Sequence, residues 1–431
     1  MPLNRRTLLK NLGAAGTVAA LAGCVGVQES STNQSGGDSD GSGDENTDSS
    51  TGETSESEPV GTASVWYSLP EPEIPGRKSA LEQFNEASDH TVKGSDISDM
   101  RKKTTSAIPA GQGPQSFEWA HDWAGDYYQR GFVVDQSDQV DVDLDVFTGA
   151  AREAIQFDGN LVGLPHDAET VALVYNKDIV DEPPETVADM VSVMGGVPRP
   201  PKTNNYGLGL PFADGYFLSA WAHAFGGYYF DDSADERIGV ALPETIKGVQ
   251  FTVDNFVPYM PNDPAYEPQA AAFAEGNAAF AINGPWYLST LNEKGIDYGV
   301  AKLPSPEGGE PKPFTGITMW YFAKAMEEGG ADAAASRSFI EWFATSEDLA
   351  LKAAQEQGSI PVLKSLVESG DLPEHVQGFS EAVQQGQPMP THPDMGKVWD
   401  PVKAALTKAF NGKDVEKAMK TADEEIRSNL E

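Results

Sequence analysis

Aromatic side chains stand beside carboxylates at separate points along the chain, and this combination could bind a sugar. Trp119 is followed closely by Asp122, and Asp214 is followed closely by Tyr216. A flat ring can cover the apolar C–H face of a sugar, whereas a carboxylate accepts hydrogen bonds from its hydroxyl groups. Charged acceptors make such bonds roughly twice as strong as neutral ones. The alternative at each place is an acid that caps a helix beside a ring packed in the core.

Trp286 follows a segment with strand character. Residues 278–282 form an apolar run, residues 283–285 are a turn signal, and Trp286 comes directly afterwards. The end of a strand would therefore present this ring to whatever lies beyond it. A single tryptophan after a turn is more often packed in the core. The recurrence of aromatics such as Trp119 and Tyr216 on other segments favours contact with a ligand instead.

The elements that would position these side chains alternate between strands and helices. Residues 64–68 are typical of a short strand, residues 69–76 of a loop and residues 77–87 of a helix with one apolar face. Residues 171–175 form a further apolar strand. This alternation indicates an α/β architecture. At 431 residues the chain is long enough for two large domains.

The composition excludes nucleic acid as a partner. Lys and Arg number 30, Asp and Glu number 66, and the formal net charge is −36, so the chain would repel a phosphate backbone. We interpret the excess of acids as adaptation to high salt, because at about 1 M salt the screening length falls to about 3 Å and crowded carboxylates repel each other little.

The sequence offers no pattern for a cofactor or a metal. Cys24 is the only cysteine, which excludes disulfides and sites with several cysteine ligands. We expect His121 to be packed or hydrogen-bonded, because no second His or Cys stands at ligand spacing. A phosphate-binding loop of the Gly-x-x-x-x-Gly-Lys type is also absent, so any ATPase would be a separate chain.

The first residues have the pattern of an export signal. Arg5 and Arg6 precede a short uncharged stretch that ends at Cys24, which predicts that residues 1–24 are a twin-arginine signal with a lipoprotein box and that Cys24 carries lipid. Residues 25–62 are rich in Ser, Thr, Gly and acids, so we expect a flexible tether. The globular part would then work at the outer face of the membrane.

The order of motifs resembles that of the maltose- and maltodextrin-binding proteins of ABC importers. Residues 119–122, Glu169, residues 175–178 and residues 282–286 carry this resemblance, which extends from about residue 65 to residue 426. It implies a two-lobed α/β fold of the type II periplasmic-binding-protein kind, in which each lobe is a mixed sheet flanked by helices.

The resemblance also implies where the lobes divide. Residues 63–167 and 318–370 would form lobe 1, and residues 168–317 and 371–431 would form lobe 2. Three crossover segments would form the hinge, and they are expected near residues 167–169, 314–319 and 368–374.

Residue by residue, the resemblance implies a ligand-binding set drawn from both lobes. Its members are Trp119, Asp122, Glu169, Asp214, Tyr216, Phe217, Tyr266, Trp286, Met389, Trp399 and Lys403.

Several positions depart from the family pattern. Trp123 replaces an Arg that reaches the ligand in the family, and Arg101 and Lys102 stand roughly where family members carry acids. Glu71 and Glu73 stand in a loop that lacks the family's Asp-Lys pair. Polar contacts at one end of the sugar are therefore altered.

Asp214 stands where the family usually has Glu, and Lys403 where it commonly has Arg. Together with the altered loop, these changes make a related di- or oligosaccharide such as trehalose an alternative to maltose.

These observations predict a binding protein and not an enzyme. We expect a monomer that closes around maltose or a maltodextrin and delivers it to the permease of an ABC transporter. One rival is a glycoside hydrolase with paired carboxylates about 5–9.5 Å apart. The lipoprotein tether and the motif order favour the carrier. A solute-binding protein for another ligand, such as a peptide, would have to explain the many aromatics.

Overall fold

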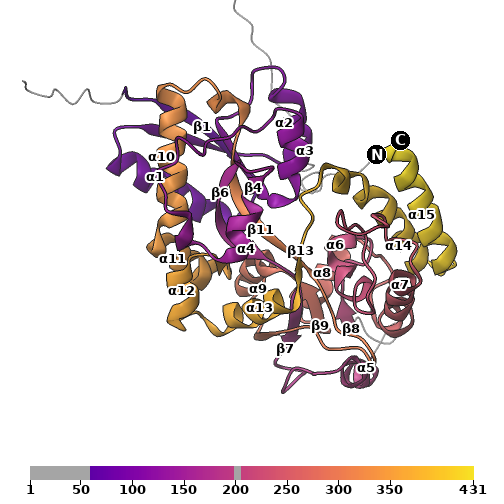
Figure 1. Ribbon diagram of the computed structural model, residues 1–431. Helices are drawn as coiled ribbons and strands as arrows, with labels where there is room; N and C mark the ends of the chain where they lie inside the picture. The colour runs from indigo at the N-terminus through magenta and orange to yellow at the C-terminus, as the bar shows by residue number, and fades with distance from the viewer. Residues whose placement is uncertain (1–58, 199–204) are drawn as a thin grey trace, which may run out of the picture. The chain divides into compact units, whose positions relative to one another are not determined.

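The computed structural model describes residues 59–198 and 205–431 (Figure 1). The predicted signal with Cys24 and the predicted tether up to residue 58 lie outside the described residues. The first strand begins at Thr62, inside the range predicted as tether. The backbone N–H of Thr62 donates to Asp332 Oδ1 at 2.7 Å, and the carbonyl of Gly61 accepts from the N–H of Thr91.

The first sheet is mixed and has seven strands. Its main order is β12-β6-β11-β3-β1-β2, and β13 pairs with β11. The neighbours β1, β2 and β3 are parallel, whereas β11 runs antiparallel to both β3 and β6. The strands of this sheet are β1 Thr62–Tyr67, β2 Thr91–Asp96, β3 Ser116–Ala120, β6 Gly163–Glu169, β11 Phe314–Phe322, β12 Ile360–Pro361 and β13 Gln387–Pro388.

The second sheet is also mixed, with the order β10-β7-β9-β8. Its central strand β9 is buried along its whole length, which fits an apolar run covered on both faces. The strands are β7 Ala172–Asn176, β8 Tyr206–Gly209, β9 Ala278–Asn283 and β10 Tyr298–Ala301. A separate two-stranded ribbon consists of β4 Gln156–Phe157 and β5 Asn160–Leu161.

Helices cover both sheets. Helices α1 and α10 pack on the first sheet, whereas α7, α14 and α15 pack together beside the second (Figure 1). The α-helices are α1 Ile74–Ala87, α2 Met100–Ala107, α3 Ala124–Gln129, α4 Gly149–Ala154, α5 Val187–Gly196, α6 Gly215–Ala222, α7 Pro243–Asn255, α8 Tyr266–Ala274, α9 Leu288–Lys294, α10 Ala331–Thr345, α11 Glu347–Gln357, α12 Lys364–Ser369, α13 Glu374–Gln385, α14 Trp399–Phe410 and α15 Val415–Leu430.

The elements predicted from local patterns are present with small shifts at their ends. The strand expected at residues 278–282 is β9, and the strand expected at residues 171–175 is β7. Helix α1 begins before the predicted residue 77, because Pro75 is tolerated in the first turn of a helix.

Alternation along the strands of the second sheet divides the core into two large clusters. In β7, Ala172 and Val174 belong to a cluster that continues into the first sheet, whereas Leu173 and Tyr175 belong to a cluster with α5, α6, α14 and α15. Successive side chains of a strand point to opposite faces, so one strand contributes to both cores. Tyr266 and Trp286 pack against both clusters.

The residues expected to form the hinge lie in two kinds of structure. Residues 167–169 are the end of β6 and residues 314–319 are the start of β11, so both segments belong to the first sheet. Residues 370–373 connect α12 to α13. Within residues 59–198 and 205–431, no helix combines the length and apolar character needed to cross a bilayer.

Candidate functional site

The end of β3 and the turn after it present Trp119 and Asp122. Trp119 is partly exposed at the end of the strand, and Asp122 is partly exposed in the 3-10 helix His121–Trp123. Buried His121 fixes this turn, because its Nδ1 accepts from the N–H of Ile317 at 3.0 Å and its Nε2 lies 3.0 Å from the carbonyl oxygen of Met389. Nε2 therefore carries the proton and donates it to that carbonyl.

Burial lowers the pKa of His121 to about 4. The ring is thus neutral, and it is buried and hydrogen-bonded as the sequence predicted. It ties the turn to β11 on one side and to the segment before α14 on the other.

Two of the predicted acids are held largely out of water. Burial raises the pKa of Asp122 to about 7, although Arg101 and a hydrogen bond from the side chain of Trp399 oppose this change. Burial raises the pKa of Glu169 to about 8, and the neighbouring charges of Asp167 and Asp122 add to the effect. Both carboxyl groups therefore lack enough donors to stabilise their charged forms.

A glycine in the neighbouring strand makes room for Glu169. Glu169 ends β6 and faces Gly316 of β11 in the antiparallel pair. A Cβ atom on Gly316 would lie 2.5 Å from Oε1 of Glu169. The glutamate side chain therefore lies directly across the backbone of the next strand.

Tyr216 lies close both to the predicted acids and to the ring of Trp286. Its pKa is raised well above the usual value, first by burial and then by the charges of Glu169, Asp214 and Asp122. Its hydroxyl group is buried and has no hydrogen-bond partner among the described residues. A buried hydroxyl without a partner costs free energy, so a ligand that pairs with it would be favoured.

The Tyr216 ring belongs to a group of aromatics that extends to Trp286. The centroid of Trp286 lies 6.2 Å from that of Tyr216 and 6.2 Å from that of Phe217, which is buried. Phe217 in turn meets Tyr266 at 5.9 Å. The Trp286 ring folds back over Gly284, where a Cβ atom would lie 2.2 Å from it.

Asp214 has an identified structural role. Its carboxylate accepts from the N–H of Tyr216 at 2.9 Å and caps the first turn of α6, with its side chain exposed. The cap fixes the start of the helix that carries Tyr216 and Phe217.

The predicted C-terminal residues occupy different environments. Met389 is buried, whereas Trp399 at the start of α14 is partly exposed and packs on Phe314 with a centroid separation of 5.8 Å. Lys403 is exposed on α14. In the described part of the chain, the hydrogen bond recorded for Lys403 is the one its backbone carbonyl accepts from the hydroxyl of Thr407 at 2.8 Å, so the contacts do not bring its side chain into the group.

A column of stacked rings backs Trp119. The rings of Trp119 and Trp123 have centroids 4.6 Å apart, and those of Trp123 and Tyr127 are 5.0 Å apart. Trp123 is only 5% exposed, so it supports Trp119 from behind. Arg101 of α2 places its Cζ atom 5.3 Å from the Trp123 ring centre.

Sequence reasoning missed a second charged cluster on the first sheet. A cavity of about 90 Å³ is lined by Glu73, Arg77, Glu118, His166 and Asp167, among others. Burial and the charges of Asp167 and Glu118 raise the pKa of Glu73 to about 8. The loop position of Glu73 was noted in the sequence, but its burial depends on contacts that are distant along the chain.

Another hollow lies away from the predicted residues. It has a volume of about 820 Å³ and lies between the start of α7 and the turn from α14 to α15. Its lining includes Lys247, Lys413 and Lys420 and none of the predicted site residues. Within the described part of the chain, no group of His, Cys, Asp or Glu side chains is arranged to hold a metal ion.

The arrangement combines carboxyl groups, a buried hydroxyl and partly exposed rings, which suits a ligand with many hydroxyl groups and apolar faces. A family model described as bacterial extracellular solute-binding protein matches residues 79–380. The chain belongs to this family.

Relatives and solved structures of this family match over most of the chain. A maltotriose-binding protein of Pyrococcus abyssi is 36% identical over 382 residues, which are 86% of this chain and 83% of the relative. A galactooligosaccharide-binding protein of Bacillus subtilis is 26% identical over 82% of this chain and 86% of its own length.

The solved structure of the Thermus thermophilus maltotriose-binding protein bound with maltotriose is 28% identical and has a TM-score of 0.77. The match covers 86% of this chain and all of that one, at 100%. The solute-binding chain therefore has the two-lobed type II periplasmic-binding fold that the sequence predicted.

Proposed function

We propose that this chain is the ligand-binding component of an ABC importer for maltodextrins, with maltotriose as the first ligand to test. The observation that carries the proposal is the similarity, over most of the chain, to proteins that are described as binding maltotriose. The arrangement of rings around carboxyl groups supports it, because the apolar faces and hydroxyl groups of glucose units need both.

In this proposal the site residues divide by role. Trp119, Trp286 and Trp399 stack on glucose rings, while Asp122 and Glu169 accept hydrogen bonds from hydroxyl groups. The remaining predicted residues line or support the site, namely Asp214, Tyr216, Phe217, Tyr266 and Met389. Lys403, which is exposed on α14, is proposed to reach the ligand only when it is bound.

The sugar acts by changing the balance between open and closed lobes. We assign residues 63–167 and 318–370 to lobe 1 and residues 168–317 and 371–431 to lobe 2. Ligand contacts from both lobes stabilise the closed form and not the open one, so binding shifts the population towards closure. A permease can then distinguish the loaded protein by its shape, and a separate ATPase chain drives transport.

The proposed location is the extracellular face of the cell membrane. The pattern of residues 1–24 supports export by the twin-arginine route, and Cys24 would carry the lipid. One acyl chain gives only marginal membrane binding, so two chains are expected on the anchor. We propose that the protein works there as a monomer.

A different oligosaccharide is the second candidate ligand. The galactooligosaccharide-binding relative supports this alternative, and trehalose follows from the departure of residues 69–76 from the family pattern. The structure corrects the predicted loop there, because residues 71–73 form a 3-10 helix and α1 begins at Ile74. Membership of a solute-binding family argues against the glycoside hydrolase. Release of shorter sugars from a maltodextrin by the purified protein would instead support the glycoside hydrolase hypothesis.

The first experiment is a titration of the purified protein in high salt. Maltotriose, maltose, trehalose and a galactooligosaccharide would be compared by calorimetry and by tryptophan fluorescence. We expect heat and a spectral change with the α-linked glucose oligosaccharides. No heat and no spectral change with any of the glucose sugars would refute binding of maltodextrins. A response only to the galactooligosaccharide would make that sugar the ligand.

A pair of tryptophan variants separates ligand contact from packing. We expect Trp286→Ala to weaken maltotriose binding by about tenfold or more, as loss of a central aromatic anchor does in other binding sites. Trp342→Ala is the matched control, because Trp342 is also partly exposed but packs on Phe84 and Phe339, with centroids at 5.6 and 6.2 Å. The control should lower the melting temperature and keep the affinity.

A further inference from the structure

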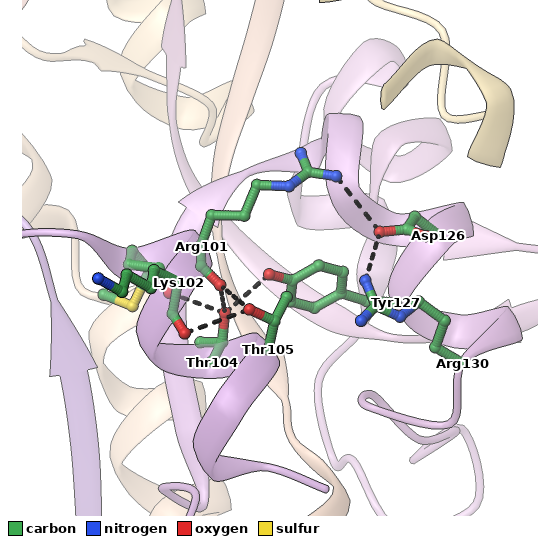
Figure 2. Close-up of polar contacts among 8 residues, drawn as sticks. Arg101, Lys102, Thr104, Thr105, Asp126, Tyr127 and Arg130 are labelled. Carbon is green, nitrogen blue, oxygen red and sulfur yellow. Dashed lines mark hydrogen bonds and ion pairs between the residues drawn. The ribbon is translucent and has the colours of Figure 1, made fainter. Parts of the chain in front are cut away.

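Arg101 is held at the start of α2 by a set of polar contacts (Figure 2). Its backbone carbonyl accepts from the hydroxyl of Thr105 at 2.7 Å and from that of Thr104 at 3.1 Å. The Thr104 hydroxyl also bonds the hydroxyl of buried Tyr127 at 2.7 Å. The backbone of Arg101 is therefore fixed relative to the column of rings that ends at Trp119.

Asp126 directs the guanidinium group. Figure 2 shows Asp126 between two arginines, with Oδ2 at 3.4 Å from Nη2 of Arg101 and at 3.2 Å from Nη1 of Arg130. Both arginine side chains are 41% exposed. The two cations therefore share one partner and have equal exposure, but Arg101 lies in α2 and Arg130 directly follows α3.

Of the two arginines, Arg101 is the one that contacts the stack of rings behind Trp119. Its Cζ atom lies 5.3 Å from the Trp123 ring, which stacks directly on Trp119. Its charge also acts on the carboxyl group of Asp122. Arg130 instead lies over Phe132, with Cζ 4.2 Å from that ring.

A glycine in the segment before α14 leaves space for the guanidinium of Arg101. A Cβ atom on Gly396, in the 3-10 helix Pro393–Lys397, would lie 3.0 Å from Nη2 of Arg101. Any larger residue would crowd the guanidinium there. Arg101 thus lies between the turn that carries Asp122 and the segment that leads to Trp399.

The donors of this guanidinium are not used up. Arginine has five N–H donors in a planar fork. Within residues 59–198 and 205–431, its one side-chain hydrogen bond is the long 3.4 Å contact with Asp126. Stacking on an aromatic ring keeps the fork flat without consuming any donor.

We propose that Arg101 is a specificity-determining residue that donates hydrogen bonds to hydroxyl groups of the glucose unit resting on Trp119, beside the acceptor Asp122. The inference depends on the proposed function, because it names a contact inside the same sugar site. A donor next to an acceptor matches a sugar hydroxyl, which can accept one hydrogen bond and donate another.

The test compares Arg101→Gln with Arg130→Gln. Both changes remove one positive charge and one partner of Asp126, so long-range electrostatics and local stability change alike. Maltotriose affinity would be measured by calorimetry with each purified variant, together with its melting temperature. We expect Arg101→Gln to bind about tenfold more weakly, because a hydrogen bond from a charged donor is lost, and Arg130→Gln to stay within about twofold of wild type.

Arg101→Lys provides a second measurement if Arg101→Gln does not fold. It keeps the charge and loses the planar fork, so its affinity should fall below that of Arg130→Gln. Equal affinities for the Arg101 and Arg130 variants would overturn the inference while leaving the sugar site intact. A wild-type protein that binds none of the glucose oligosaccharides would instead overturn the proposed function itself.

Discussion

Two carboxyl groups carried by β3 and the turn after it have opposite environments. Glu118 in β3 is 4% exposed and accepts hydrogen bonds from both terminal nitrogens of the Arg77 guanidinium, with Nη2 at 2.9 Å from Oε1. Nε2 of His166 lies 3.1 Å from the same Oε1. Burial alone would raise the pKa of Glu118, but Arg77 and His166 outweigh it and hold the pKa at about 2.

Asp122, just after the same strand, has no such partner. The charge of Arg101 and the hydrogen bond from Trp399 do not balance its burial, and its pKa is raised to about 7. Glu169 follows the same pattern, with a pKa of about 8. The charged form of each is therefore poorly stabilised in the protein without ligand.

We propose that the difference separates a structural charge, Glu118, from two ligand-binding groups, Asp122 and Glu169. Glu118 has its donors inside the fold, so its interactions are complete before any ligand arrives. Asp122 and Glu169 have been moved out of water without an equivalent set of donors, and sugar hydroxyl groups would supply the missing hydrogen bonds. We infer that the unbalanced burial of these two acids is a cost in stability that ligand binding recovers.

The largest expected effect comes from breaking the buried ion pair between Arg77 and Glu118, which we call the balanced pair. Arg77→Met would leave Glu118 buried without its main cation, so we expect the free energy of unfolding to fall by roughly 3–5 kcal/mol. Arg77 also lies over the rings of Trp320 and Phe343, at 4.9 and 4.7 Å, and these contacts are partly kept by methionine. Urea unfolding at neutral pH measures the change.

The double variant Arg77→Met/Glu118→Met is the control for that prediction. Removing both charges leaves no uncompensated carboxylate, so it should be more stable than Arg77→Met alone. If the single and double variants lose the same stability, the ion pair is not what holds this part of the core.

Asp122 and Glu169 were easier to single out from the sequence than Glu118. Asp122 and Glu169 stand in motifs whose order resembles a known family, so the resemblance singled them out, and their role in binding stays a prediction. Glu118 is one of 66 acids, and nothing local distinguishes it. Its partner Arg77 is 41 residues away, and only the meeting of α1 with the first sheet brings them together.

The same limit applies to Trp123. The family resemblance implied only that Trp123 replaces an Arg that reaches the ligand in other members. The structure places its ring inside a stack, with the guanidinium of Arg101 over it. By contrast, the strands and helices with clear periodicity, such as β9 and α1, were predictable because their patterns are local.

The next effect is a pH dependence with opposite signs for the two kinds of acid. Asp122 and Glu169 bind protons more tightly in the folded chain than in the unfolded chain, because their pKa values are raised from 3.8 to about 7 and from 4.5 to about 8. Their contribution to stability is therefore complete below about pH 4 and is lost as pH rises to about 8. Glu118 contributes above about pH 4.5 and loses its contribution as pH falls towards 2.

The variant Asp122→Asn isolates the contribution of Asp122 to the pH dependence of stability. Urea unfolding of wild type and variant would be measured between about pH 4 and pH 8 at constant high salt, so that general repulsion among the acids is the same in both. We expect wild type to lose more stability than Asp122→Asn as pH rises through this range. Parallel profiles would mean that Asp122 is solvated and that its contrast with Glu118 is wrong.

The smallest expected effect concerns the position of Glu169. Gly316→Ala would place a methyl group 2.5 Å from the Glu169 carboxyl, so the side chain must move away from its present position. We expect maltotriose to bind about three- to tenfold more weakly, since one charged acceptor is displaced but not removed. Calorimetry measures the affinity, and a melting curve measures any loss of stability.

Gly76→Ala is the matched substitution beside the balanced pair. A methyl group there would meet only the terminal amide of Gln357, at 2.7 Å, and that side chain can move aside. Gly76 lies in α1, where alanine is favoured over glycine by up to about 1 kcal/mol. Gly76→Ala should therefore keep the affinity and raise the stability slightly, whereas Gly316→Ala should lose affinity. If Gly76→Ala lost affinity and Gly316→Ala kept it, the ligand would lie against the charged cluster around Arg77 and Glu118 instead of against Glu169.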